Sequence, residues 1–385
     1  MGSGYGSACC SAWGFYMLEH GGNIGAVAAL YGIPAEQWLD LSTGINPIGW
    51  PIPVLPPETW SRLPQDDDGL VETARRYYGS EDLLPVAGSQ AAIQMLPRLR
   101  DCARIGVLTP TYAEHARAWV AAAHEVVPLT ASAVENTLDA LDVLVLANPN
   151  NPTGETFNQG TLLKWHACLA ARGGWLVVDE AFMDAAPEHS LAFETQRSGL
   201  IVLRSLGKFF GLAGVRVGFV LAEPALLTTL HEQLGPWTVS GPARAVARAA
   251  LADRVWQEAA RLHLRQAAAR LSDLLAHHGL RPAGGTALFQ WVLPPAPEAE
   301  LLRRRRQSAQ RSIVHSDGSA QCRKSIRLGH WALPQARSLH EALARQGILT
   351  RLFTDPTGLR FGLPGVEAEW QRLEAALSTA RRAVA

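Results

Sequence analysis

The sequence has few of the features that mark secreted, membrane-spanning or strongly charged proteins. It contains five cysteines in 385 residues, an odd number without regular spacing. Such usage suits reduced thiols better than a disulfide framework or a zinc site. No uninterrupted apolar run approaches the roughly 20 residues that span a bilayer. Residues 1–16 lack the basic and apolar stretches of a signal peptide. We therefore expect a soluble, cytoplasmic protein.

An excess of charge of either sign is also missing. Lys plus Arg and Asp plus Glu number 35 each, so no net field favours nucleic acid or an anionic membrane as a partner. The basic run at 303–306 is more typical of a solvated loop than of a binding patch. The expected partner is a small molecule, with no nucleic acid and no membrane.

The length of the chain exceeds the size at which one hydrophobic core keeps growing, so two lobes are expected. Composition marks residues 1–16 as a disordered extension and the tract near 296–335 as an irregular insertion. The expected divisions are an N-terminal arm at 17–60, a large domain at 61–255 and a small C-terminal domain at 256–385 that contains the insertion.

Short runs rich in Val, Ile and Leu recur along the middle of the chain, and most are separated by stretches long enough for crossover helices. This pattern predicts an α/β fold with a mostly parallel sheet buried on both faces. Residues 256–278 have apolar positions at helical spacing. The tail at 338–385 predicts a small α+β lobe with strands at 348–353 and 359–363 between two helices. The apolar runs are 105–108, 142–147, 175–178, 200–203 and 217–221.

Polar motifs follow several of these runs. Ligands of open α/β sheets bind beyond the carboxyl ends of the strands, so one site could collect all the motifs. Singly, each motif is as compatible with a turn, a helix start or a cap as with function. Lys208 stands out because an ammonium group is costly to bury without a partner. The motifs are VAGSQAA (86–92), NPNNPTG (148–154), DEAF (179–182) and SLGK (205–208).

The order of these motifs resembles that of the fold-type I pyridoxal-phosphate enzymes, the aminotransferase-like superfamily. The resemblance extends from Met17 to the closing helix. It implies that pyridoxal 5′-phosphate is the cofactor and that Lys208 is the lysine that forms a Schiff base with it. It also implies a phosphate site made of Gly88, Ser89, Gln90, Ser205 and Arg216.

The same resemblance implies ligands for the cofactor ring. Asp179 matches the aspartate that pairs with the ring nitrogen, Asn151 the donor to the phenolic oxygen, and Tyr112 the aromatic that stacks on the ring. Together with Lys208, Asp179 and Tyr112 are the expected catalytic residues. Phe182 replaces a tyrosine of many aminotransferases, and Leu63 replaces a tyrosine that often reaches the neighbouring subunit. A homodimer is still expected.

The N-terminal arm narrows the resemblance. EHGGNIGAVAALYGI (19–33), LDLSTGINPIG (39–49) and PWTVSGPA (236–243) are similar to segments of threonine-phosphate decarboxylases of cobalamin biosynthesis, which are related to histidinol-phosphate aminotransferases. The implied reaction converts O-phospho-L-threonine to (R)-1-amino-2-propanol O-2-phosphate and CO2. Arg360 would bind the α-carboxylate, and the other expected substrate ligands are His20, Gly21, Asn46 and Asn151.

Two alternatives remain open at this point. One is a histidinol-phosphate or other amino-acid aminotransferase, which would consume 2-oxoglutarate. The other is a non-catalytic binding protein of the same fold, which the joint presence of Lys208, Asp179, Asn151 and Arg216 disfavours. Without the resemblance, residues 20–23 would be interpreted as a flexible turn before a helix.

Overall fold

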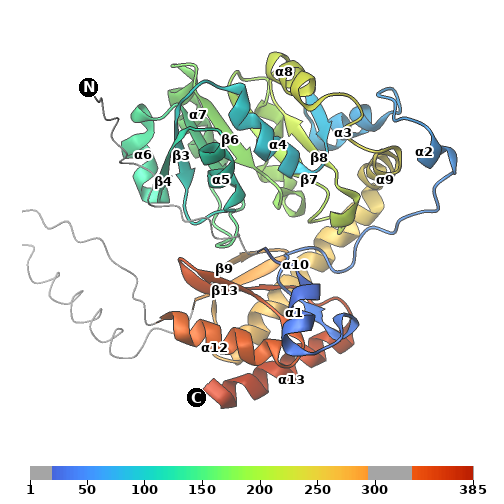
Figure 1. Cartoon of the computed structure of the whole chain (residues 1–385), viewed down its shortest axis with the longest axis vertical. Coiled ribbons are helices and arrows are strands. Elements are labelled where there is room, and N and C mark those ends of the chain that lie inside the picture. Colours follow the sequence, from blue (N-terminus) through green and yellow to red (C-terminus); the bar gives the residue numbers. More distant parts are fainter. Residues whose placement is uncertain (1–19, 294–331, 385) are drawn as a thin grey trace, which may run out of the picture.

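The computed structural model describes residues 20–293 and 332–384, which form two lobes (Figure 1). The expected extension at 1–16 and most of the expected insertion near 296–335 lie outside the described residues. Residues 332–335 belong to helix α12 (Ala332–Ala344).

The upper lobe in Figure 1 contains a seven-stranded sheet with helices on its faces. Strands β3 to β7 run parallel, whereas β8 is antiparallel to both of its neighbours. Every residue of β5 and β7 is buried, as expected for central strands covered on both sides. The predicted mostly parallel sheet is confirmed. In sheet order the strands are β2 (Leu83–Val86), β8 (Gly218–Leu221), β7 (Leu200–Ser205), β6 (Trp175–Asp179), β5 (Val143–Ala147), β3 (Arg104–Leu108) and β4 (Glu125–Leu129).

Helices of this lobe begin at residues suited to helix starts. The Asn158 side chain accepts a hydrogen bond from the Thr161 amide at 2.8 Å at the start of α7. Ser240 does the same for Ala243 at the start of α9, and both satisfy donors that a helix leaves unpaired. The helices are α2 (Glu58–Ser61), α3 (Leu70–Tyr78), α4 (Ser89–Met95), α5 (Glu114–Ala121), α6 (Val134–Thr137), α7 (Gln159–Ala170), α8 (Pro224–Leu234) and α9 (Gly241–Ala252).

Helix α10 (Arg254–His277) leads from the upper lobe into the lower one (Figure 1). It confirms the helix predicted at 256–278. The lower lobe contains an antiparallel sheet in the order β12, β13, β10, β9, flanked by α12 and α13 (Glu367–Val384). The strands of this sheet are β9 (Pro282–Thr286), β10 (Phe289–Val292), β12 (Arg351–Thr354) and β13 (Thr357–Gly362).

The strand predicted at 348–353 is divided in the structure. Residues Ile348–Leu349 form β11, which pairs in parallel with β1 (Leu39–Asp40), whereas β12 joins the four-stranded sheet. Thr350 lies between them, and its hydroxyl contacts His340 Nδ1 at 2.9 Å. The strand-like stretch contains Thr350 and Arg351 at its centre, and its two halves pair with different partners.

The N-terminal segment packs on the lower lobe before it enters the upper one. Helix α1 (Ile24–Tyr31) belongs to the lower part of Figure 1, where its apolar side chains pack against Trp38, Leu349 and Ala344 of α12. The chain then passes the Lys208 loop, where the backbone amide of Asn46 donates to the Lys208 carbonyl oxygen at 3.0 Å. The segment at 39–50 therefore touches both lobes. No helix in the described ranges is long and apolar enough to cross a bilayer.

Candidate active site

The predicted site residues gather at the carboxyl edge of the parallel strands. Strand β6 ends on Asp179 and strand β7 on Ser205, with Lys208 three residues later. Asn151 follows β5 in the turn at 148–154. Parallel strands bring their carboxyl ends to one edge of a sheet, so motifs far apart in the chain meet there.

Lys208 is partly buried between the two lobes. Its Nζ lies 3.4 Å from the Thr43 carbonyl oxygen and 5.5 Å from the centre of the Phe182 ring. Burial, together with the positive charge of Arg360 and against the negative charge of Asp179, lowers the pKa of Lys208 to about 8. A neutral amine, which is the nucleophilic form, is therefore accessible near neutral pH.

Asp179 is held by contacts on both carboxylate oxygens. Oδ1 accepts from the Ala181 amide at 3.0 Å, and Oδ2 accepts from His115 Nε2 at 2.9 Å. Both side chains are buried. His115 was not among the residues expected from the sequence. The available signal was its position three residues after Tyr112, in the PTYAEH segment, where its backbone amide donates to the Tyr112 carbonyl oxygen at 3.1 Å.

Tyr112 lies between two histidines. The centre of its ring is 6.0 Å from that of His20 and 6.0 Å from that of His115. The hydroxyl donates to Gln90 Oε1 at 3.2 Å. Burial, aided by the negative charges of Glu114 and Asp179, raises the pKa of Tyr112 to about 12. The ring is therefore neutral, fixed in place and suited to stacking.

The Gly88 loop and Arg216 form a cradle of anion-binding groups. Gly88 has a φ of +74°, a backbone conformation that favours glycine, and Arg216 lies against it, with Nη2 2.5 Å from where a Cβ would stand. Arg216 donates to the Ala213 carbonyl at 3.2 Å and has no carboxylate partner among the described residues. Ser205 Oγ accepts from the Gly207 amide at 3.2 Å. Backbone amides, a hydroxyl and a guanidinium match a phosphate dianion.

Arg360, on β13, is a buried cation with polar but uncharged partners. It donates to Asn151 Oδ1 and to the Ser42 carbonyl oxygen, and its Nε has no hydrogen-bond partner in the described structure. Burial, with the nearby charge of Arg351, lowers the pKa of Arg360 to about 9. Since a buried charge is costly unless it is paired, this arrangement fits a site that receives an anion.

The N-terminal site residues have protein partners of their own. His20 Nε2 lies 3.1 Å from Glu114 Oε1. A Cβ on Gly21 would lie 2.5 Å from the Ser42 carbonyl oxygen, so the chain passes closely there. In the Asn46 side chain, Nδ2 donates to the Phe209 carbonyl oxygen at 2.9 Å and Oδ1 accepts from the Ile48 backbone amide at 3.0 Å. The contacts of Asn46 are those of a residue that holds the Lys208 loop, and its role as a substrate ligand stays a prediction.

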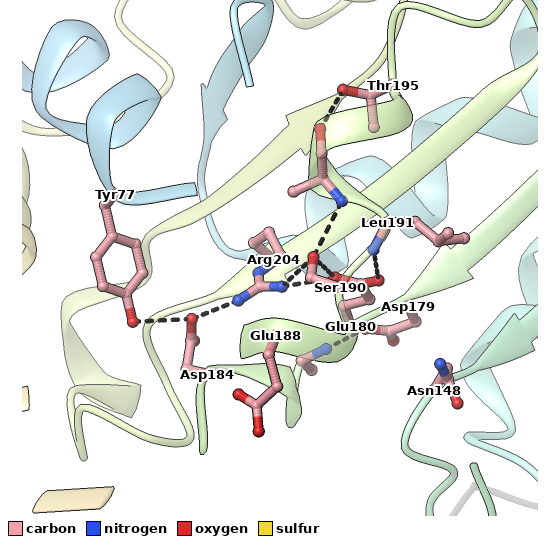
Figure 2. A network of polar contacts seen from close by, with 12 residues as sticks. Tyr77, Asn148, Asp179, Glu180, Asp184, Glu188, Ser190, Leu191, Thr195 and Arg204 are labelled. Atoms are coloured by element: carbon pink, nitrogen blue, oxygen red, sulfur yellow. Dashed lines mark hydrogen bonds and ion pairs between the residues drawn. The ribbon is translucent and has the colours of Figure 1, made fainter. Parts of the chain in front are cut away.

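A buried ionic network begins at Glu180, the residue after Asp179 (Figure 2). Arg204 donates to Glu180 Oε2 at 2.6 Å and to Asp184 Oδ1 at 2.5 Å. Burial raises the pKa of Glu180, against the opposing effect of Arg204. Tyr77 donates to Asp184 at 3.1 Å, and Glu180 also accepts from the Leu191 amide at 2.8 Å. The network fixes the segment that follows β6 and the strand that leads to Lys208.

Comparison with known proteins places this site in a family. The model for aminotransferase class I and II matches residues 63–345. The threonine-phosphate decarboxylase of Pseudomonas aeruginosa is 52% identical over 361 residues, which cover 94% of this chain and 97% of the relative. This chain belongs to the threonine-phosphate decarboxylase family. The threonine-phosphate decarboxylase of a Sinorhizobium species is 44% identical, over 75% of this chain and 86% of that protein.

Membership in the threonine-phosphate decarboxylase family confirms the main interpretation of the sequence over the aminotransferase alternative. It also confirms pyridoxal phosphate as the cofactor. Among solved structures, the histidinol-phosphate aminotransferase of Sinorhizobium meliloti, in complex with pyridoxal 5′-phosphate, has a TM-score of 0.73 at 20% identity. The alignment covers 97% of this chain and all of that one. This likeness confirms the fold.

Proposed function

We propose that this protein removes the carboxylate of O-phospho-L-threonine as CO2 and releases (R)-1-amino-2-propanol O-2-phosphate for cobalamin biosynthesis. The observation that carries the proposal is the set of charges around Lys208. Burial lowers the pKa of Lys208, the positive charges of Arg360 and Arg216 lower it further, and the negative charge of Asp179 opposes the shift. Two guanidinium groups without carboxylate partners in the described structure suit two anions, a carboxylate and a phosphate.

The chain's own residues then divide into cofactor and substrate ligands. Arg216, Ser205 and the loop of Gly88, Ser89 and Gln90 would hold the cofactor phosphate. Tyr112 would cover the ring, Asn151 would donate to its phenolic oxygen, and Asp179 would pair with its nitrogen. His115 would keep the Asp179 carboxylate in position through their 2.9 Å contact. Bound pyridoxal phosphate supplies the conjugated system that accepts the electron pair released at Cα.

Substrate binding fixes which bond breaks. Arg360 would grip the α-carboxylate, while His20 and Gly21 of the arm would face the substrate phosphate. The Cα–carboxylate bond breaks, CO2 leaves, and Cα takes a proton that Lys208 Nζ would donate. The aromatic rings of Phe289 and Phe353, 5.2 and 5.9 Å from the Arg360 guanidinium, line the carboxylate side with apolar surface. Such surface suits a leaving group that becomes neutral.

We also propose that the enzyme is a cytoplasmic homodimer. Large apolar side chains are exposed along the segment before α3 and in the loop before α9, which supports a self-association surface. Cys102 and Cys168, the cysteines in the described ranges, are both unpaired, which supports a reducing compartment. The exposed side chains are Ile52, Val54, Trp60, Leu63 and Trp237.

Product analysis tests the reaction directly. Purified protein with pyridoxal phosphate and O-phospho-L-threonine should form CO2 and aminopropanol phosphate in equal amounts without 2-oxoglutarate. Unphosphorylated threonine should be a poorer substrate by at least about 100-fold, because the phosphate ligands would stay unpaired. Lys208→Ala should keep the cofactor phosphate ligands and lose turnover. Glutamate from histidinol phosphate and 2-oxoglutarate, with no CO2 from phosphothreonine, would show that the proposal is wrong.

A further inference from the structure

Glu114 is a buried carboxylate that the proposed reaction does not use. It lies in the first turn of α5, and its side chain is 8% exposed. Oε2 accepts from Gln90 Nε2 at 3.2 Å and from Gln94 Nε2 at 3.1 Å. Oε1 lies 3.1 Å from His20 Nε2 and 3.6 Å from Arg117 Nη1. Four donors around one carboxylate fix it firmly.

This carboxylate joins the N-terminal arm to the wall of the site. Gln90 donates to Glu114 with its nitrogen and accepts from the Tyr112 hydroxyl with its oxygen. His20 contacts Glu114 on the other side, and its ring lies 6.0 Å from that of Tyr112. A continuous polar chain therefore runs from Tyr112 through Gln90 and Glu114 to His20.

The contact with Glu114 determines which nitrogen of the His20 ring is left for another partner. A carboxylate accepts only, so Nε2 carries the proton in this contact. Nδ1 has no partner among the described residues, and the His20 side chain is 49% exposed. A phosphate can accept from Nδ1 only when that nitrogen is also protonated, and the negative charge of Glu114 balances the resulting imidazolium.

We propose that Glu114 is a positioning residue that orients His20 toward the phosphate of the substrate and holds the N-terminal arm beside Tyr112. This inference rests on the proposed function, because it assigns His20 to the substrate phosphate. The Gln90 and Gln94 contacts keep Glu114 in place independently of His20. The carboxylate is thus a fixed point to which the arm attaches.

Four proteins test the proposal: wild type, Glu114→Gln, His20→Ala and the double variant. Glu114→Gln keeps the shape of the side chain and removes its charge. It should raise KM for phosphothreonine by about tenfold, as expected for loss of a charge-assisted hydrogen bond, with kcat changed less than about twofold. Competitive inhibition by inorganic phosphate should weaken by the same factor. The double variant should match His20→Ala alone, because the two residues act as one unit.

Two further variants separate orientation from support of the fold. Glu114→Asp keeps the charge and should recover part of the lost affinity. Glu135→Gln removes an exposed carboxylate that contacts Lys164 at 3.1 Å and should leave KM unchanged. Cofactor affinity should change less than KM for phosphothreonine in both Glu114 variants, because Tyr112 and Gln90 keep their contact with each other. Thermal melting of Glu135→Gln should match that of the wild type.

The inference is wrong if Glu114→Gln leaves KM unchanged, weakens cofactor affinity as much as it raises KM, or still raises KM when His20 is already alanine. Each outcome would assign Glu114 a role other than orienting His20. Failure of the proposed function has a different signature, which is absence of CO2 from the wild-type protein. In that case, calorimetric binding of phosphothreonine to the same variants still decides whether Glu114 acts through His20.

Discussion

The reactivity of Lys208 depends on the charges that face it. An exposed lysine has a pKa near 10.4, whereas burial and the Arg360 charge lower that of Lys208 to about 8. Between these two values the Lys208 amine is mostly neutral in the folded protein, while an exposed amine remains mostly protonated. The chain has three lysines, Lys164, Lys208 and Lys324, so the difference can be measured residue by residue.

Acylation of the cofactor-free protein across a pH series should reveal this difference in pKa. The rate at Lys208, read by peptide mass spectrometry, should rise with pH with a midpoint near 8, because only the neutral amine reacts. Lys164, which is exposed, serves as the internal control. Arg360→Gln should move the Lys208 midpoint upward by removing a positive charge. Equal pH profiles at Lys208 and Lys164 would contradict the assigned environment.

At the scale of elements, strands β6 and β7 position the site through what lies behind it. Strand β7 carries Arg204 immediately before Ser205, and β6 is followed by Glu180 immediately after Asp179. In each pair of neighbouring residues, one (Asp179 or Ser205) belongs to the site. The other (Glu180 or Arg204) belongs to the buried network of Figure 2. The Arg204 guanidinium also lies 4.7 Å from the centre of the Tyr78 ring.

Removing the cation from this network should destabilise the whole fold. Arg204→Met leaves Glu180 and Asp184 buried without their counter-ion, which should cost about 3–5 kcal/mol in the free energy of unfolding. Arg197→Met, which breaks the exposed contact with Glu194 at 2.7 Å, is the matched control and should cost less than about 1 kcal/mol. Urea unfolding at pH 7 measures both. A loss no larger than that of the control would show that the network does not stabilise the fold.

At the scale of the whole molecule, exposed apolar side chains support the proposal that two copies associate. Val54 is 99% exposed and Trp60 is 70% exposed. Val54 belongs to the segment that leads to α2 and Trp60 to α2 itself, at the edge of the upper lobe in Figure 1. Side chains of this size gain from removal from water, by about 25 cal/mol per Å² of apolar surface buried. They are well placed to contact a second copy.

Charge introduced at this surface should dissociate the proposed dimer. Val54→Asp combined with Trp60→Asp should shift the mass measured by analytical ultracentrifugation from twice the 41.6 kDa of the chain toward one copy. Val366→Asp is the control: Val366 is 62% exposed and precedes α13, where an aspartate is tolerated at a helix start. A wild-type protein that sediments as one copy at micromolar concentration would contradict the proposal.

Local patterns in the sequence were enough for the parallel strands, the long helix α10 and the identity of the central motifs. Apolar runs report a strand that is buried on both faces, and Asp179 and Lys208 follow such runs directly. Because parallel strands end at one edge, the convergence of these motifs followed from their order alone.

The tertiary structure decided what depends on contacts between distant segments. His115 and Asp179 are 64 residues apart, and His20 and Glu114 are 94 apart. Hydrophobic periodicity carries information about which face of an element is buried, and none about which polar side chains meet across the fold. For the same reason, the strand-like stretch at 348–353 could not show that its two halves join different sheets. The partners of His20, Asp179 and Arg204 became visible only once the chain had folded.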